Sequence, residues 1–369
     1  MGRHSQVFLY GCDVESFVEI KRLVAFMSLA AVVVPAAVFA APNAELLDVF
    51  AARGDLQKAF SASVNYQAVP NSPAGFLVDL EDWARQYGWK EYPRLSSYAP
   101  VVTPPIQKAT TGIPTVTSNA YILIDRASGQ VLAASHADTS WPIASLTKLV
   151  TADLVLAGAK PLSTVYDVKI SDDVGGAKLY VNDGDTFTLD DLLYSTLVGS
   201  ANNAANAIAR STGDTTDVFL KKMNQRAALL NLSRTMFVDP TGIELGNVST
   251  ARELSVLATS IFERKDIRRY TTTAQRTVSV LSQGTTKTLT NTNWMLWKPE
   301  YDDVYVTSGK TGYLDESGWN LVVSLRPMSD KNKELLLVLF GADSRTDSFK
   351  DADALSNWAW TNYQWTSVN

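Results

Sequence analysis

The spacing of apolar residues changes from that of strands to that of helices and back again over residues 119–369. The segments YILID and QVLAAS alternate on either side of a turn at 127–129, and they predict a β-hairpin. Apolar residues then recur at helical spacing, most clearly over 145–158 and 189–210. Strand patterns return in TVSVLSQGTTKTL, VYVTSGKTG, WNLVVSL and ELLLVLFGA, and a last helix is expected over 346–363.

Strands at both ends of this region, with helices between them, predict an α+β fold. One antiparallel sheet would be assembled from both ends of the region, with a helical lobe inserted between its strands and helices covering it. Small residues around Ser200 interrupt the helical stretch 189–210, and we expect a break there.

The first 41 residues have the pattern of an export signal. Lys21 and Arg22 precede an apolar run over 23–41, which contains a small-x-small pattern ending at Ala40. An apolar run of this length could also span a bilayer uncleaved. The sequence therefore predicts a signal peptide or an N-terminal membrane anchor over 1–41. In either form the rest of the chain is exported to the periplasmic or extracellular side, where the cell wall lies.

Two smaller regions precede the main domain. Helical spacing over 44–60 and 76–88 predicts a small helical extension in 42–99. We interpret the extension as a stalk or packing appendage, with a wall-binding or partner-binding module as the alternative. Residues 100–118 are rich in Pro and Thr, which is typical of a linker. The main domain is therefore expected over 119–369.

The composition excludes several kinds of chemistry. A formal net charge of -5 gives no basic surface overall, so nucleic acid is not expected as a partner. The histidines are His4 and His136, and the single cysteine is Cys12. If the first forty residues are removed, a cysteine nucleophile, a structural zinc site and a disulfide framework are excluded. We interpret His136 as a loop histidine beside Asp138 and not as a triad base, and we expect neither a metal nor an organic cofactor.

Ser145 and Lys148 are the first candidates for catalysis. They lie three residues apart at the start of a predicted helix, so both side chains project from one face of it. For Lys148 to act as a base near neutral pH, its pKa must fall by about 3 units, which burial and a second nearby cation could supply. Taken alone, the pair is more often a helix N-cap serine followed by a solvated lysine.

Two further motifs favour the catalytic interpretation of Ser145 and Lys148. Ser200 and Asn202 lie in the predicted helix break, and Lys310, Thr311 and Gly312 lie on a predicted strand. The patterns Ser-x-x-Lys, Ser-x-Asn and Lys-Thr-Gly together are the set of serine β-lactamases and penicillin-binding proteins. In acyl transfer Lys310 can supply a cation and Thr311 a hydroxyl. Gly312 has no side chain, so an extended substrate could pair with this strand edge, and a simple bulge is the alternative.

Over about 119–369 the chain resembles the serine-type D-alanyl-D-alanine carboxypeptidases, the low-molecular-mass penicillin-binding proteins. The resemblance rests on WPIASLTKL around Ser145, LVGSANNAA around Ser200, DPTG at 239–242 and STARELSVLA from Ser249. It implies a β-lactamase/transpeptidase-like fold with an antiparallel five-stranded sheet flanked by helices. It also implies that peptidoglycan stem peptides are the substrates and that β-lactam antibiotics are covalent inhibitors.

The resemblance implies a role for each matching residue. Ser145 would be the acyl-ester nucleophile and Lys148 its general base. Ser200 would relay a proton to the leaving D-alanine. The remaining residues would hold the substrate: Asn202 at an amide, Lys310 and Thr311 at the terminal carboxylate, Gly312 along the strand edge, and the backbone N–H groups of Ser145 and Tyr313 as the oxyanion hole.

Three other functions are retained as alternatives. A DD-endopeptidase that cleaves peptide crosslinks would use the same residues. A β-lactamase needs a carboxylate to activate the deacylating water, for which Glu244 is the candidate. A catalytically silent wall-binding protein would keep the fold, although every reactive residue is present. Trp294, Trp297 and Tyr301 could line a sugar or peptide groove, but we favour packing for them.

Overall fold

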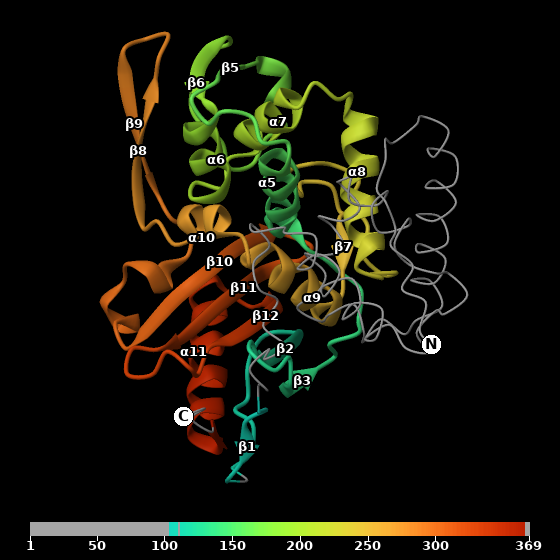
Figure 1. Ribbon diagram of the computed structural model, residues 1–369, viewed down its shortest axis with the longest axis vertical. Coiled ribbons are helices and arrows are strands. Elements are labelled where there is room, and N and C mark those ends of the chain that lie inside the picture. The colour runs from blue at the N-terminus through green and yellow to red at the C-terminus, as the bar shows by residue number, and fades with distance from the viewer. Residues whose placement is uncertain (1–102, 110, 366–369) are drawn as a thin grey trace, which may run out of the picture. The chain divides into compact units, whose positions relative to one another are not determined.

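A five-stranded antiparallel sheet organises the computed structural model, which describes residues 103–109 and 111–365 (Figure 1). The strand order is β10-β11-β12-β2-β3, so strands from the beginning of the domain lie beside strands from its end. This arrangement confirms the predicted α+β fold. The strands are β2 (Ala120–Asp125), β3 (Val131–Ser135), β10 (Val304–Leu314), β11 (Gly318–Pro327) and β12 (Leu335–Ala342).

The central strands of the sheet are covered on both faces. Alternate side chains of each strand point to opposite faces, so they enter two different apolar clusters. In β12, Leu336 and Val338 join the apolar cluster that the sheet shares with the helical lobe. Leu337 and Leu339 join a second cluster, which also contains Phe349 from the C-terminal helix. Every residue of β12 is buried as a result, which explains why its sequence is a continuous apolar run.

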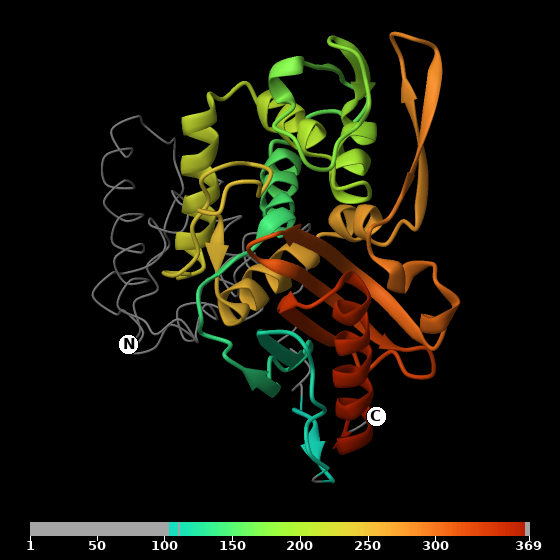
Figure 2. The ribbon, with the colours of Figure 1, turned by 180° about the vertical axis from the view of Figure 1, so that it is seen from behind.

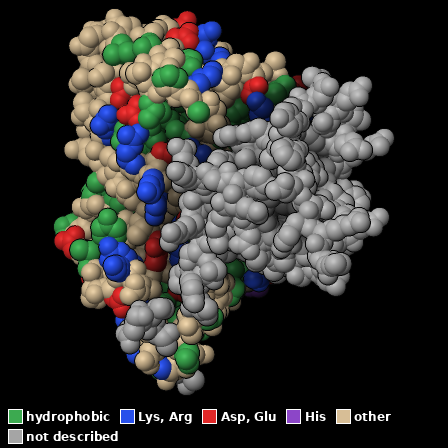
Figure 3. Space-filling model, in the orientation of Figure 1, with side chains coloured by type: hydrophobic (Ala, Val, Ile, Leu, Met, Phe, Trp, Pro, Cys, Tyr) green, Lys and Arg blue, Asp and Glu red, His purple; other side chains and the backbone are tan. Residues whose placement is uncertain are grey.

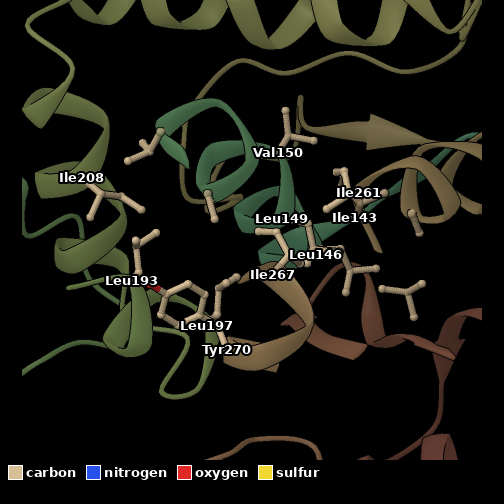
Figure 4. Close-up of a cluster of buried hydrophobic side chains, with 14 of the residues drawn as sticks. Ile143, Leu146, Leu149, Val150, Leu193, Leu197, Ile208, Ile261, Ile267 and Tyr270 are labelled. Atoms are coloured by element: carbon tan, nitrogen blue, oxygen red, sulfur yellow. The ribbon is translucent and has the colours of Figure 1, made fainter. Parts of the chain in front are cut away.

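The helical lobe is inserted between β3 and β10 in the chain. Its apolar side chains meet in one buried cluster, where Leu149 from one helix lies near Leu197 and Ile267 from others (Figure 4). The helices predicted over 145–158 and 189–210 are confirmed, including the break that separates α6 from α7. The helices of the lobe are α5 (Lys148–Ala157), α6 (Leu189–Leu197), α7 (Asn202–Ser211), α8 (Thr216–Leu229), α9 (Ala251–Phe262) and α10 (Lys265–Thr271).

The last helix, α11 (Arg345–Asn362), covers the other face of the sheet (Figure 2). Part of the segment that we predicted as a linker is bound along this helix. The backbone N–H and hydroxyl groups of Thr117 and Ser118 all donate to the Asp351 carboxylate. Strand β1 (Ile106–Gln107) also pairs with β13 (Tyr363–Gln364). The described residues of 103–118 therefore contact the domain directly.

Two hairpins stand beside the helical lobe. Strands β8 (Gln275–Val280) and β9 (Thr285–Thr290) form the predicted hairpin of the TVSVLSQGTTKTL segment. Strands β5 (Val165–Val168) and β6 (Asp185–Thr188) form the other, and in both views β6 stands beside the β8–β9 hairpin (Figures 1 and 2).

Two predicted regions lie outside the described residues: the export signal or anchor over 1–41 and the helical extension over 42–99. Within the described part of the chain, we find no helix that combines the length and the apolar character required to cross a bilayer.

Candidate active site

The candidate nucleophile lies where an irregular turn leads into a buried helix. Ser145 belongs to a short 3-10 helix, Ala144–Thr147, and Lys148 is the first residue of α5. Ala144 has a φ of 50°, in the left-handed region that non-glycine residues rarely occupy. Such backbone strain is commonly found at functional sites, where surrounding contacts maintain it. Ser145 is half-buried, so its hydroxyl is not sealed in the core.

Lys148 is fully buried, and its ammonium group lies against three oxygen atoms. Its Nζ donates hydrogen bonds of 2.7 Å to the Ser145 hydroxyl, 2.7 Å to Asn202 Oδ1 and 2.6 Å to the Thr241 carbonyl. Burial lowers the pKa of Lys148 from 10.5 to about 7, and the charge of Asp239 opposes that shift. A large fraction of the Lys148 side chains is therefore neutral at pH 7, in contact with the Ser145 hydroxyl.

The DPTG turn supports this pair, although the sequence alone assigned no role to Asp239. One Asp239 carboxylate oxygen accepts hydrogen bonds from the backbone N–H groups of Thr241 and Gly242. This turn presents the Thr241 carbonyl to Lys148. Gly242 has a φ of 83°, and a Cβ atom there would lie 1.9 Å from the Ala144 carbonyl oxygen. Only glycine fits this position, so the motif brings the turn against the backbone next to the nucleophile.

Ser200 and Lys310 form a second serine–lysine pair. Ser200 lies in the break between α6 and α7 with a φ of 58°, and Lys310 Nζ donates a hydrogen bond of 2.8 Å to its hydroxyl. Lys310 is almost completely buried. Burial lowers its pKa well below the ordinary value, and the positive charges of Lys148 and Arg345 lower it further. The charge of Lys148 therefore destabilises the charged form of Lys310, whereas burial accounts for the lowered pKa of Lys148 itself.

Asn202 connects the catalytic residues to the loop that precedes α6. Its side-chain oxygen accepts from Lys148, and its Nδ2 donates a hydrogen bond of 2.7 Å to the Gly175 carbonyl. Its backbone N–H donates to the Ala177 carbonyl at 2.6 Å. Both ends of the amide group are therefore engaged, and the loop over 173–183 is fixed beside the site.

Gly312 allows the edge strand to approach the nucleophile closely. A Cβ atom on Gly312 would lie 2.9 Å from the Ile143 carbonyl oxygen and 3.2 Å from the Ser145 nitrogen. The irregularity in the register of β10 lies between Val306 and Ser308, so Gly312 is not a bulge. Strand β10 is an edge strand of the five-stranded sheet. One of its two sides, including the backbone at Gly312, therefore has no neighbouring strand within that sheet.

Thr311 and Arg345 lie at the same end of the site as Lys310. Arg345 was not predicted from the sequence. The Thr311 hydroxyl donates to the Thr292 hydroxyl at 2.6 Å, and an Arg345 Nη atom donates to the Thr292 carbonyl at 3.2 Å. The guanidinium lies 4.9 Å from the ring centroid of Trp294 and 5.5 Å from that of Trp319. Burial lowers the pKa of Arg345, yet arginine stays charged at neutral pH.

The aromatic residues near this end are mainly structural, as we favoured for Trp294 and Tyr301. Their ring centroids lie 5.5 Å and 6.2 Å from that of Phe349. Trp297 differs, since 43% of its surface is exposed. Tyr313 follows Gly312 and stacks on Trp319 with ring centroids 4.2 Å apart.

Two other candidate residues lie apart from this set of contacts. Glu244 is exposed, and its backbone N–H donates to the Asp239 carboxylate at 2.9 Å. His136 lies in the loop after β3, and its carbonyl accepts from the Thr139 N–H. Among the described residues no group of three His, Cys, Asp or Glu side chains could hold a metal ion.

The sheet, the inserted helical lobe and the paired serines and lysines define a serine hydrolase with a β-lactamase/transpeptidase-like fold. The model of the D-alanyl-D-alanine carboxypeptidase family matches residues 107–344, and the chain belongs to this family. A D-alanyl-D-alanine endopeptidase of Pseudomonas aeruginosa is 32% identical over 243 residues, covering 65% of this chain and 76% of that protein.

Two solved structures are also similar. The Streptomyces K15 DD-transpeptidase is 25% identical with a TM-score of 0.62, covering 68% of this chain and 100% of that one. Penicillin-binding protein D2 of Listeria monocytogenes, solved in its ampicillin-bound form, is 26% identical with a TM-score of 0.58. That match covers 66% of this chain and 98% of the other.

Proposed function

We propose that this protein hydrolyses the terminal D-alanyl-D-alanine bond of peptidoglycan stem peptides through an acyl-enzyme on Ser145. The observation that carries the proposal is the contact between the Ser145 hydroxyl and Lys148, a buried lysine whose pKa is lowered to about 7. A neutral amine in this position can accept the hydroxyl proton as the oxygen attacks the substrate carbonyl. An exposed lysine with an ordinary pKa could not do so near neutral pH.

The reaction would proceed in two halves. The Ser145 oxygen bonds to the carbonyl carbon while Lys148 takes the hydroxyl proton, and the oxyanion is held by backbone N–H groups of Ser145 and Tyr313. The C–N bond then breaks, and the proton held by Lys148 passes through the Ser200 hydroxyl, which contacts Lys310, to the leaving amine, so that Lys148 is neutral again. Water next attacks the ester, which releases the shortened peptide and restores the Ser145 hydroxyl.

The residues around this pair suit an extended peptide with a free carboxylate. Lys310, Thr311 and Arg345 place two basic side chains and a hydroxyl at one end of the site, and a bound carboxylate would favour the charged form of Lys310. The substrate backbone would add to the free edge of β10 at Gly312 and Tyr313, as an added strand does. Asn202 would hold a substrate amide after exchanging its bond to Gly175. β-lactams, which also present a carbonyl and a carboxylate, would acylate Ser145 at the same place.

The activity requires that the protein be exported to the cell-wall side of the membrane. The apolar run over 23–41 supports export, either as a cleaved signal or as an N-terminal membrane attachment.

Acylation by a fluorescent penicillin tests the proposal. The full chain and its Ser145→Ala variant would be incubated with the compound, and the labelled peptide located by mass spectrometry. We expect a label that persists on Ser145 and is absent from the variant. Rapid turnover of the label would favour a β-lactamase, and folded protein that is not labelled would contradict the mechanism.

Endopeptidase cleavage of crosslinked peptides is the second candidate function. It is favoured by the similarity to the endopeptidase of Pseudomonas aeruginosa, because the match covers 76% of that protein. The chemistry at Ser145 would be unchanged, and only the leaving group would be larger. Hydrolysis of a crosslinked peptide dimer, compared with that of a monomeric pentapeptide, distinguishes the two.

A further inference from the structure

A cavity of about 510 Å³ is lined by the loop that Asn202 contacts through Gly175 and by the β8–β9 hairpin, and it takes no part in the chemistry described above. Its walls come from the β5–β6 region, the loop over 173–183, the start of α7 and the β8–β9 hairpin. We call it the lysine groove, because three lysines line it together with the partly exposed segment around Tyr180. Its lysines are Lys169, Lys178 and Lys287.

Hydrogen bonds hold both walls of the lysine groove in place. On one side the Asn203 side chain accepts from the Leu179 N–H at 2.9 Å and donates to the Leu179 carbonyl at 2.8 Å. On the other side Gln283, near the tip of the hairpin, donates to the Asp185 carboxylate of β6 at 2.7 Å. The groove is therefore formed before any ligand arrives, which lowers the entropic cost of binding.

The lysine groove adjoins the end of the active site where the leaving group would lie. Asn203, which lines the groove, directly follows Asn202, and Thr292, just beyond the hairpin, contacts Thr311. The acylated half of a substrate would pair with β10 on the Tyr313 side of Gly312. The base of the β8–β9 hairpin lies toward Thr311 and Ser200, where the bond to the leaving amine would be broken, and the groove is lined by this hairpin and by the loop over 173–183.

Asp173 and Asp183 line the groove beside the three lysines, and the pairing of these lysines decides which of them could meet a carboxylate. Lys178 is paired with Asp173 at 2.6 Å, and Lys169 lies 3.8 Å from Asp167. For Lys287, no carboxylate lies within 4.0 Å among the described residues, and the charge of Asp185 on β6 acts on it. On the face shown in Figure 3, basic side chains near the β8–β9 hairpin and α10 are interspersed with acidic ones, and Arg269 and Arg276 are paired with Asp190.

Apolar surface at the same groove favours a peptide over a small anion. Tyr180 is 78% exposed and Ile170 is 77% exposed, and both line the groove. Large apolar side chains exposed together at a preformed cavity commonly mark a binding surface. A single released D-alanine would leave most of this volume and all of this surface unused.

We propose that the lysine groove binds the leaving strand of a crosslinked wall peptide, with a carboxylate of that strand against Lys287. The inference rests on the proposed acyl-enzyme function and extends it, because only an endopeptidase substrate has a second peptide on the leaving side. The groove would orient that strand while Ser145 attacks the crosslinking bond, and it would increase kcat/KM for crosslinked substrates only.

Substitution of Lys287 tests the inference in the full chain. Lys287→Gln removes the charge, Lys287→Arg keeps it, and Lys350→Gln removes an exposed lysine from α11 on the other face of the sheet. For each variant kcat/KM would be measured with a crosslinked peptide dimer and with a monomeric pentapeptide, alongside the rate of penicillin acylation. In Lys287→Gln we expect kcat/KM for the dimer to fall about tenfold, as for the loss of one charge-assisted hydrogen bond.

The same measurements decide each outcome. The inference requires that the pentapeptide and penicillin rates stay within about twofold, that Lys287→Arg restore dimer cleavage, and that Lys350→Gln behave as the wild type. An equal loss with dimer and pentapeptide would overturn it in favour of a structural role for the hairpin. Unchanged dimer cleavage in Lys287→Gln would also overturn it. Absence of penicillin acylation in the wild type would instead contradict the proposed function itself.

Discussion

The Lys148 ammonium donates a hydrogen bond of 2.7 Å to the Ser145 hydroxyl from a fully buried position. Because burial lowers the pKa of Lys148 to about 7, the neutral form becomes dominant as the pH rises above that value. In the proposed mechanism only the neutral form can accept the Ser145 proton, so activity would follow the protonation of this lysine.

The first prediction concerns the pH dependence of acylation. The rate of Ser145 acylation by penicillin is expected to rise roughly tenfold per pH unit below pH 7 and to level off above it, following neutral Lys148. Stopped-flow measurements between pH 5 and 9 give this profile. Lys148→Arg should be inactive throughout, because arginine does not lose its proton. A rate that is independent of pH across this range would exclude Lys148 as the base.

The second prediction concerns stability. The native pKa of Lys148 lies below its unfolded value of 10.5, so the unfolded chain binds more protons between pH 7 and 10.5. Stability from this residue therefore increases as the pH rises through that window, by about 1.4 kcal/mol per pH unit. Urea unfolding of the wild type and of Lys148→Met at pH 7.5, 8.5 and 9.5 isolates the effect. The difference in unfolding free energy between the wild type and Lys148→Met should change with pH by that slope. If the two unfolding free energies changed with pH in parallel, the lowered pKa of Lys148 would be contradicted.

Much of the fold was predictable because it follows from local periodicity. The hairpin of β2 and β3 and the apolar strand β12 each have a sequence pattern that one sheet environment explains. The motif residues were also predictable as a set, since Ser145 and Lys148 are neighbours on one helical turn. Ser200 and Lys310 could be paired only by resemblance, because they are 110 residues apart in the chain.

The remaining site residues depend on contacts that no local pattern encodes. Arg345 reaches Thr292 across 53 residues, and nothing around it in the sequence distinguishes it from any arginine at a helix start. Asp239 lies in a recognisable turn, yet its support of the Thr241 carbonyl appears only when the turn meets Lys148. Likewise, the bonds from Thr117 to Asp351 span 234 residues, and a segment rich in Pro and Thr gives no sign of them.

The third prediction concerns Gly312. An alanine methyl there would lie 2.9 Å from the Ile143 carbonyl and 3.2 Å from the Ser145 nitrogen, so β10 must move away from the nucleophile. Displacement by about 1 Å at a catalytic centre can cost on the order of a hundredfold in rate. We expect Gly312→Ala to slow penicillin acylation by about that factor. Gly112→Ala is the matched control, because its Cβ would meet no atom within 4 Å, and equal rates for both variants would contradict the prediction.

The fourth prediction separates the hydroxyl of Ser200 from its backbone conformation. Ser200 has a φ of 58°, which alanine tolerates poorly and glycine adopts freely. We expect Ser200→Gly to be more stable than Ser200→Ala by about 1 kcal/mol. Both variants lack the acceptor for Lys310 and should slow peptide hydrolysis by about 10²-fold or more. If Ser200→Gly kept wild-type activity, the hydroxyl would have no part in proton transfer to the leaving amine.

The fifth prediction concerns Arg345, whose guanidinium donates to the Thr292 carbonyl and lies within 6 Å of the ring centroids of Trp294 and Trp319. A partly buried arginine next to Lys310 is suited to a bidentate pair with the terminal carboxylate of the substrate. Such a pair contributes about 1.5 to 3 kcal/mol. Arg345→Gln should therefore raise KM for a peptide with a free carboxylate by about ten- to a hundredfold.

The matched control substrate for Arg345→Gln is the same peptide with an amidated end, which cannot form the pair. We expect the wild type to cleave it poorly and the variant to lose little further, so that the preference for the carboxylate largely disappears. If both substrates were affected equally, Arg345 would act by supporting the packing around Trp294.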